Sequence, residues 1–524
     1  MKKILFYTIA LAVCFGFGAC SDPGDEIKEG NYPRVFSPLN FEAGSIKETS
    51  AVLKWKDAVG ASYYCIEVYA DDSLEFKGEP VATDEVADIT YTLSGLTYDT
   101  RYSVRLTAIS GDPTKEDSKY SECTFRTSAQ QILSNPKEAD ILDRSVTLSW
   151  NEGETDVTKI VITPGNIVHE ITPEEIAASK AVVEGLNPET EYDAYLYFTQ
   201  NGVDKQRGHR TFTTIADLAG ATIVDPDVDN LQQLLTDAEE GQVFALKPGN
   251  FYFGTESETG AVTVTKSVTI KGIYPTNTPV IYGRFQLEQG AGIVANNIIF
   301  DGSKNTTTDQ TFVYKTADAV YGPLTLTNSE IRNFGKGVYY VSIKCTVESM
   351  TFENCLIHHI ACDGGDMFDC RKGYIKTLTF AKSTLWNTGT PADRDCIRYD
   401  DASADFPEAV RPVITIENNT FYNFGKSHGI LYVRFAGNES HIKNNLLVNI
   451  NNYWSNQSKT NAPEFVGNAY CNSANMVTTL SPGVYDESGK VVADPQFKDP
   501  ANGDFTIQNE DVKKLNVGDP RWLK

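Results

Sequence analysis

The sequence is poor in positive charge. Of its 524 residues, 46 are Lys or Arg and 70 are Asp or Glu, which gives a formal net charge of −24 at pH 7. Proteins that bind nucleic acids need a basic surface, because much of their affinity comes from releasing the counterions of the phosphates. The composition therefore argues against a general nucleic-acid binder, and an anionic ligand has to be met by a local basic patch.

The sequence also lacks paired-cysteine motifs. Its ten cysteines include no Cys-x-x-Cys pair and show no Cys/His spacing typical of a zinc site. Cys14 and Cys20 fall in the leader described below, which leaves eight for the body of the protein. Five of these eight cluster in one region: Cys345, Cys355, Cys362, Cys370 and Cys396. Disulfides can form there in an oxidising compartment, but we expect stacked, buried thiols.

The chain begins with an apolar segment that is too short to span a membrane. Lys2 and Lys3 precede an apolar run over residues 4–18, and small residues lead to Cys20 in "FGAC". This resembles a lipoprotein signal over 1–20 with Cys20 as the lipidated residue; an ordinary secretory signal is the alternative. The acidic segment 21–31 resembles the tether of Bacteroidota surface lipoproteins. That resemblance implies a lipid-anchored outer-membrane protein that faces the cell exterior, with a glycan-uptake complex as a candidate partner.

Two early segments, 32–127 and 134–215, have the alternating apolar pattern of β-sandwiches. In each, a Trp lies in an alternating strand (Trp55, Trp150), a "GL" turn follows, and a Tyr comes after that turn (Tyr102, Tyr192). These features resemble fibronectin type III domains, in which the Tyr ties down a corner of the sandwich. The resemblance implies spacers or binding surfaces, so we do not expect catalysis in these two segments.

The pattern changes at about residue 217. A short amphipathic helix with Leu231, Leu234, Leu235 and Ala238 on one face is followed by recurring phrases such as "SMTFENCLIHHI", "TLTFAKSTLWNTG" and "VITIENNTFYNFG". Each phrase holds a short strand, a polar step that usually includes Asn, and a second strand, which is typical of a solenoid. The pattern and the ending "DPQFKDPANGDFTIQ" resemble pectate-lyase-like right-handed parallel β-helices. The sequence thus predicts an all-β chain: two sandwiches and a right-handed parallel β-helix over 217–524.

One expected strand of the solenoid, within "GGDMFDCRKGYIKTLTF", is unusually charged. Stacking "DMFDCRK", "DCIRYDD" and "GILYVRF" on successive coils turns Phe368, Cys370, Ile397, Tyr399, Leu431 and Val433 inward. Alternation then turns Asp369, Arg371, Arg398, Asp400, Tyr432 and Arg434 outward as one strip. Cross-strand ion pairs are the purely structural explanation. The loops of the same coils add further ionisable residues, which favours a site: His358, His359, Asp363, Asp366, Lys372, Asp393, Arg394, Lys426 and His428.

These residue types suit a polysaccharide lyase. Removal of the proton beside a uronate carboxylate needs a cation for that carboxylate, a base, and a proton donor for the leaving oxygen. We expect Lys372 as the base, Arg398 and Arg371 as the cations, and His428 and Tyr432 as alternative proton carriers. The remaining candidates are expected to bind substrate: Arg394, Arg434, Asp400, His358 and His359.

The charged phrases are also similar to a known family. "DMFDCRK" and "CIRYDD" resemble the site of β-helix lyases of the chondroitinase-B and alginate-lyase type. That resemblance places Lys372 and Arg398 in the catalytic roles and implies a Ca²⁺ ion on Asp366 and Asp369. It favours glycosaminoglycans of the chondroitin, dermatan or hyaluronan kind as substrates, with pectin or alginate next.

Two other interpretations remain open. A glycoside hydrolase of the polygalacturonase type would use carboxylates, which Asp395, Asp400 and Asp401 offer together with His428. A non-catalytic glycan-binding protein would stack sugars on Tyr399, Tyr432, Tyr453 and Trp454. Exposed aromatic rings favour binding, whereas a buried ionisable group with a shifted pKa among the arginines favours catalysis.

Overall fold

The computed structural model describes residues 32–200, 202–388, 394–406, 411–424, 428–450, 453–478 and 483–524. The predicted signal, Cys20 and the acidic tether lie outside these ranges. Within them, no helix has the length and apolar character needed to cross a membrane.

The first sandwich consists of two antiparallel sheets. One contains β1 (Leu39–Gly44), β2 (Ser50–Lys56) and β5 (Thr90–Ser94); the other contains β4 (Ala82–Val86), β3 (Ala61–Ala70), β6 (Arg101–Ser110) and β7 (Ser121–Arg126). Trp55 lies in the core between them, 5.3 Å from the ring of Tyr64 in an edge-on contact. The hydroxyl of Tyr102 accepts a 2.8 Å hydrogen bond from the backbone N–H of Thr97, as expected of a corner tyrosine.

The second sandwich has the same kind of core. β10 (Ile167–Glu170), β9 (Lys159–Thr163), β12 (Glu191–Gln200) and β13 (Val203–Thr213) form one sheet, and β11 (Lys180–Glu184) pairs with β8 (Ser145–Ser149) in the other. Helix α2 (Pro173–Ala178) begins at a capping box made by Thr172 and Glu175. Trp150 is buried, and Tyr192 stacks on Phe212 at 5.8 Å.

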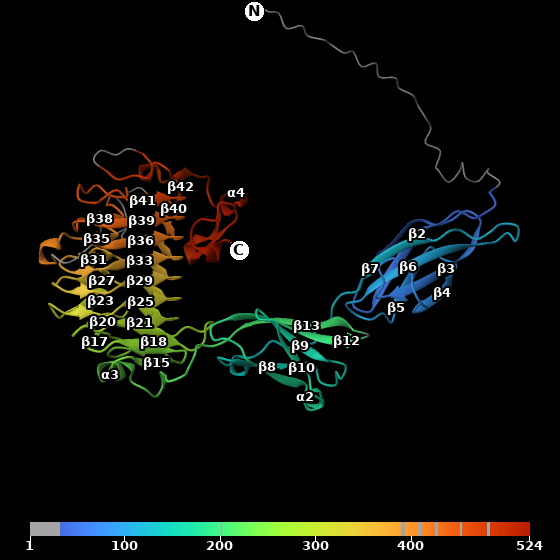
Figure 1. The fold of residues 1–524 in the computed structure, drawn as a ribbon, viewed down its shortest axis with the longest axis horizontal. Coiled ribbons are helices and arrows are strands. Elements are labelled where there is room, and N and C mark those ends of the chain that lie inside the picture. The colour runs from blue at the N-terminus through green and yellow to red at the C-terminus, as the bar shows by residue number, and fades with distance from the viewer. Residues whose placement is uncertain are drawn as a thin grey trace, which may run out of the picture. The chain divides into compact units, whose positions relative to one another are not determined.

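The C-terminal part is a parallel β-helix built from three long sheets, whose strands stack in chain order in Figure 1. The first sheet contains β14 (Thr222–Val224), β15 (Gln242–Leu246), β18 (Val268–Gly272), β21 (Ile293–Asn296), β25 (Leu324–Thr327), β29 (Met350–Glu353), β33 (Thr377–Ala381), β36 (Val413–Glu417), β39 (Glu439–Lys443) and β41 (Glu464–Val466). The second contains β16 (Asn250–Tyr252), β19 (Val280–Tyr282), β22 (Ile299–Asp301), β26 (Glu330–Arg332), β30 (Leu356–His358), β34 (Thr384–Trp386), β37 (Thr420–Tyr422), β40 (Leu446–Val448), β42 (Ala469–Cys471) and β43 (Lys490–Val491).

The third sheet contains β17 (Ala261–Val264), β20 (Arg284–Leu287), β23 (Gln310–Tyr314), β27 (Gly337–Val341), β31 (Phe368–Cys370), β35 (Ile397–Tyr399) and β38 (Leu431–Val433). A short sheet of β24 (Val320–Tyr321), β28 (Thr346–Val347) and β32 (Tyr374–Ile375) fills one corner. Helix α3 (Leu231–Thr236), capped by Asn230, packs on the first coils with Leu231 and Leu235 buried. The all-β prediction with a parallel β-helix is confirmed.

The recurring Asn residues make the corners of the coils. Between the first and second sheets the chain turns at single residues with positive φ, among them Asn328, Asn354 and Asn444 at φ of 50°, 54° and 53°. Asn adopts this left-handed conformation more readily than most side chains, which explains why the sequence repeats it. A buried ladder lies beside these corners: the Asn445 side-chain oxygen accepts from the Asn419 N–H at 2.9 Å.

The C-terminal segment packs on the outer face of the second sheet. It contains β44 (Phe497–Asp499), β45 (Asp504–Ile507) and helix α4 (Glu510–Lys513). Phe505 meets the Trp386 ring at 5.4 Å, and the Thr384 hydroxyl donates to the buried carboxylate of Asp519 at 2.7 Å. Short 3₁₀ turns complete the chain: Glu138–Asp140, Ser403–Asp405, Ala474–Met476, Pro500–Asn502 and Pro520–Trp522.

The cysteines of the solenoid behave as core residues. Cys345, Cys355, Cys362, Cys370 and Cys396 are all buried, and Cys345, Cys355, Cys370 and Cys396 carry free thiols. Burial raises the pKa of Cys345 and Cys355 to about 12, so both stay protonated at neutral pH. The expectation that these cysteines are buried in the core is confirmed.

Candidate functional site

The expected charged strip forms on the outer face of the third sheet. Asp369, Arg398 and Tyr432 are direct neighbours on the parallel strands β31, β35 and β38. Their neighbours along each strand, such as Phe368 and Ile397, are buried in the core. The period-two alternation read from the sequence therefore places the charged side chains correctly.

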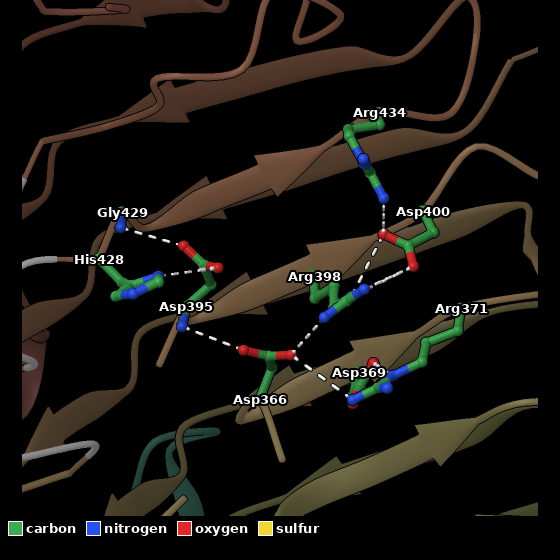
Figure 2. A network of polar contacts seen from close by, with 9 residues as sticks. All are labelled: Asp366, Asp369, Arg371, Asp395, Arg398, Asp400, His428, Gly429 and Arg434. Atoms are coloured by element: carbon green, nitrogen blue, oxygen red, sulfur yellow. Dashed lines mark hydrogen bonds and ion pairs between the residues drawn. The ribbon is translucent and has the colours of Figure 1, made fainter. Parts of the chain in front are cut away.

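Ion pairs join these charges across three coils, as Figure 2 shows. Both Asp369 oxygens accept from Arg371 Nε at 3.0 Å, and Arg371 Nη2 adds a 2.8 Å bond. Arg398 lies between two carboxylates, with Nη1 3.3 Å from Asp366 and Nη2 2.9 Å from Asp400. We call these residues the Arg–Asp strip, which consists of Asp366, Asp369, Arg371, Arg398, Asp400 and Arg434.

The ion pairs set the protonation of the strip. Burial works against the charged form of Arg398, but Asp400 and Asp366 hold its pKa above the ordinary value. Burial likewise opposes ionisation of Asp400, yet hydrogen bonds from Arg398 and Arg434 lower its pKa. Arg398 is therefore a permanent cation suited to holding an anion, and it is a poor candidate for a base.

Asp369 is the most enclosed carboxyl group of the strip, with no exposed surface. Burial raises its pKa, and the nearby Asp366 adds to this, while Arg371 opposes it. A carboxyl group that keeps its proton above the usual range can act as a hydrogen-bond donor.

A second cluster lies at the start of the same strands and includes Asp395, which the lyase interpretation did not use. Asp395 is 7% exposed; its carboxylate accepts the Gly429 N–H at 3.1 Å and lies 3.3 Å from His428 Nδ1. Its backbone N–H donates to Asp366 at 3.2 Å, which connects this pair to the strip. Burial raises the pKa of Asp395 and the charge of Asp366 adds to it, whereas His428 opposes it. An Asp–His pair of this kind can carry a proton.

Gly429 leaves space for an aromatic ring beside this pair. A Cβ at this position would lie 3.0 Å from Cε2 of Tyr453 and 3.2 Å from the Trp454 carbonyl oxygen. The Tyr453 ring thus occupies the place of a side chain next to Asp395, and it is half-buried.

Three other predicted residues make none of the contacts just described. Lys372 is exposed on the turn after β31, and its side chain makes no hydrogen bond or ion pair within the described ranges. Arg394 directly precedes Asp395 and is half-buried. Asp401 bonds to Lys459 at 2.7 Å instead of facing the strip.

His358 and His359 belong to a different face. His358 lies on β30 of the second sheet, 2.9 Å from Glu330 and stacked on Trp386 at 4.0 Å. His359 contacts His358 through their Nδ1 atoms at 2.6 Å. The structure does not bring either histidine to the strip. Asp363 is exposed on the loop before Asp366, while Asp393 and Lys426 lie outside the described residues.

The donor set does not fit calcium. Ca²⁺ takes six to eight oxygen ligands. Here both predicted ligands, Asp366 and Asp369, bind guanidinium groups that would repel a cation. No group of three or more His, Cys, Asp or Glu among the described residues is arranged to hold a metal ion. These two carboxylates therefore act as partners of the arginines and not as metal ligands in the chemistry proposed below.

The aromatic residues divide into two groups. Tyr399 and Trp454 are 1% and 0% exposed, so they cannot stack on a sugar as the glycan-binding interpretation requires. Tyr432 is half-buried on the outer face, with the Arg398 and Arg434 guanidinium carbons 5.3 and 4.7 Å from its ring centre.

Comparison with known proteins identifies the parts of the chain separately. Residues 36–124 match the fibronectin type III domain family, so the first sandwich is a domain of that class. In the solenoid, residues 249–388 match a family described as "Domain of unknown function (DUF4957)", and residues 414–522 match "Domain of unknown function (DUF5123)".

Solved structures similar to parts of this chain include fibronectin domains. A two-domain segment of chicken tenascin is 17% identical, covering 34% of this chain and 97% of its own, with a TM-score of 0.24. The FN5 domain of Drosophila Lar is 24% identical, covering 18% of this chain and 98% of its own, with a TM-score of 0.16.

Proposed function

We propose that the solenoid cleaves a uronate-containing acidic polysaccharide on the outer face of the third sheet, by β-elimination. The observation that carries this proposal is the Asp395–His428 pair next to the arginines of the Arg–Asp strip. The pair supplies a proton carrier and the arginines supply cations for the uronate carboxylate, and the chemistry needs both at one place.

His428 is the base in this proposal, in place of Lys372. Its Nδ1 faces Asp395, so we assign the uptake of the proton to Nε2, and its side chain is 48% exposed. Asp395 orients the ring and stabilises the imidazolium ion that forms. The C5–H electron pair becomes the C4–C5 double bond, the C4–O bond breaks, and the leaving oxygen takes up a proton.

The arginines hold the substrate carboxylate. Their cationic N–H groups lower the energy of the negative charge that develops when C5 loses its proton. Arg371, Arg398 and Arg434 keep 33%, 22% and 35% of their side-chain surface exposed, so each can meet a ligand while it stays bonded to an Asp. Tyr432, whose ring contacts both Arg398 and Arg434, is the candidate for the group that protonates the leaving oxygen.

One observation favours hydrolysis as a second candidate. The pKa of the Asp395 carboxyl is raised by burial and by Asp366, as in the general acid of a glycoside hydrolase. In that case Asp395 gives its proton to the glycosidic oxygen, and water is added across the bond.

One assay separates the two reactions. The purified protein is incubated with chondroitin, hyaluronan, alginate and polygalacturonate, and both reducing ends and the ultraviolet absorbance of unsaturated uronate are followed. Elimination raises both signals together, and hydrolysis raises reducing ends alone. If neither signal rises on any polymer, while the protein is retarded in gels that contain one of them, the face binds glycan without cutting it.

The proposal includes a cell-surface location. The signal-like segment ending at Cys20 supports a lipid anchor in the outer membrane, where a surface enzyme can pass fragments to a glycan-uptake complex. Labelling with a fatty acid tests this: Cys20→Ala has to abolish the label and release the protein from the membrane. If the label stays, Cys20 is not the anchor.

A further inference from the structure

The outer face of the second sheet carries a further row of aromatic and charged side chains. Successive strands of this sheet, from β16 to β30, place one residue of the row on each coil: Tyr252, Tyr282, Asp301, Arg332 and His358. Their neighbours along the strands, such as Ile281 and Ile331, are buried in the core. We call these five residues the second-sheet row, and the proposed elimination uses none of them.

The row ends where the C-terminal segment begins to cover the sheet. The neighbour of His358 on the next coil is Trp386, which packs against Phe505 of that segment. Farther along, the covered residues of the sheet form an apolar cluster with the segment: Leu446, Val448, Ala469, Cys471, Ile507, Val512 and Val517. The second-sheet row lies before this covered part, and its polar composition is that of a surface that meets water or a ligand.

Two stacked tyrosines form one end of the row. The ring centres of Tyr252 and Tyr282 are 5.1 Å apart with the ring planes at 14°, and both residues are half-buried. Lys304, from the turn after β22, places its Nζ 4.8 and 5.0 Å from the two ring centres. Aromatic rings that are rigid and still accessible offer an apolar surface on which the C–H face of a sugar can pack.

A guanidinium group and carboxylates follow directly after the tyrosines. Arg332 Nε donates to Asp301 at 2.7 Å, and Arg332 Nη1 donates to Glu330 at 2.7 Å. The side chains of Arg332 and Glu330 keep 28% and 20% of their surface exposed. A hydroxyl group both donates and accepts hydrogen bonds, so two neighbouring hydroxyls of a sugar can bridge this guanidinium group and carboxylate.

The charges of this face do not favour an anion. The cations Arg332 and Lys304 are outnumbered by three carboxylates, which belong to Asp301, Glu330 and Glu256. His358 is bound to one of these carboxylates, that of Glu330, at 2.9 Å. An anionic ligand would approach more carboxylates than Lys and Arg side chains, whereas an uncharged ligand meets no such repulsion.

From these contacts we infer that the second-sheet row binds an oligosaccharide of uncharged sugars. One sugar packs on Tyr252 and Tyr282, and the hydroxyl groups of the next sugar bond to Arg332 and Glu330. Tyr282 and Arg332 are two strands apart, which is about 10 Å and comparable with the length of two linked sugars. The row lies on a different sheet from the Arg–Asp strip, so the inference does not depend on the proposed function.

The experiment measures binding of uncharged polymers to the full-length protein. Migration is followed in native gels that contain galactan, arabinan, mannan or dextran, and the dissociation constant is measured for each polymer that retards the protein. Tyr252→Ala and Tyr282→Ala remove the aromatic pair; leucine replaces alanine if a variant has a lowered melting temperature. Tyr485→Ala is the matched control, because Tyr485 is a half-buried tyrosine outside the row that bonds to Glu487 at 2.8 Å. Arg434→Gln tests the Arg–Asp strip in parallel.

We expect at least one of these polymers to retard the protein. Each change of a row tyrosine weakens binding by about fivefold or more, because an aromatic contact is lost. Tyr485→Ala and Arg434→Gln leave binding unchanged. Raising the salt concentration also leaves it unchanged, since salt screens charged contacts and the ligand has no charge.

Three results would overturn the inference. They are no retardation by any of the uncharged polymers, binding that falls steeply with salt, and wild-type binding in folded variants of both row tyrosines. Cleavage of uronate polymers, measured on the same protein, keeps the proposed function separate. If an uncharged polymer binds through the tyrosines and no uronate polymer is cleaved, the inference stands and the proposed function fails.

Discussion

A substitution of His428 is the best way to separate a loss of activity from a loss of stability. Its side chain is 48% exposed and its contact with Asp395 is long, at 3.3 Å. His428→Gln removes little packing, so we expect the free energy of unfolding to change by about 0.5 kcal/mol or less. Loss of a general base lowers the rate by roughly 10²–10⁴-fold, which corresponds to about 3–5 kcal/mol of transition-state stabilisation.

Asp395 should respond differently. It is 7% exposed and accepts the Gly429 N–H at 3.1 Å. Asp395→Ala leaves that buried donor without an acceptor, which costs about 1–3 kcal/mol of stability in addition to activity. We therefore expect the two variants to lose the same amount of activity, whereas Asp395→Ala lowers the melting temperature more than His428→Gln does.

The assay compares initial rates of product formation with thermal unfolding for both variants. His441→Gln is the control, because His441 also pairs with a carboxylate, that of Glu464 at 2.6 Å, but lies on the first sheet. It has to retain the wild-type rate. Undiminished activity in His428→Gln refutes the role of this residue in proton transfer, and a collapse of its melting temperature shows that the contact is structural.

Three further predictions concern the pH dependence, the buried ladder and the calcium interpretation. Burial raises the pKa of Asp369, so the folded protein keeps this proton at a pH where the unfolded chain has lost it. The contribution of this proton to the free energy of unfolding is fully present below the unfolded pKa of about 3.9 and is lost as pH rises through the folded pKa. The loss is about 1.4 kcal/mol for each pH unit that separates the two pKa values. Thermal unfolding measured across that pH range should therefore show the melting temperature of Asp369→Asn rise relative to that of wild type as pH increases. A difference between the two melting temperatures that does not change with pH would contradict this. Asn445→Ala leaves the Asn419 N–H unsatisfied in the buried ladder and should cost about 2–4 kcal/mol in urea unfolding; a cost near zero would mean that water replaces the amide. Chelator should change neither the melting temperature nor the rate, since guanidinium groups occupy Asp366 and Asp369, and a loss of rate on chelation would restore the calcium interpretation.

The outward direction of the charged side chains could be predicted because it depends only on their neighbours in the same strand. In a strand, alternate residues point to opposite faces, so the apolar Phe368 and Ile397 fix the direction of their neighbours Asp369 and Arg398. The recurring phrases supplied the register, because each coil repeats the same short strand and Asn corner. The fold and the outward set could therefore be obtained from the sequence.

The surroundings of each charge could not be predicted in the same way. His358 is close in sequence to Asp366, but it is the last residue of β30, and the left-handed residue His359 then turns the chain away from the second sheet. Which of three faces a residue occupies depends on the length of the following loop, and composition does not give that length. Lys372 lies two residues beyond the end of β31, so the alternation of the strand does not fix the direction of its side chain.

The burial of Asp395 shows a further limit and explains how the site is best tested. Gly429 and Tyr453 from later coils create its environment, and no sequence pattern near Asp395 indicates them.

The stacking of coils also makes Arg398 a poor residue for testing function, because it pairs with Asp366, which is 1% exposed. Removing Arg398 takes the nearer of two cations from a buried carboxylate and leaves only Arg371 at 3.9 Å, so lost activity would combine lost folding with lost binding. His428 and Arg434 are more exposed and lie on the same face, so loss of activity or binding in their variants reports on the site itself.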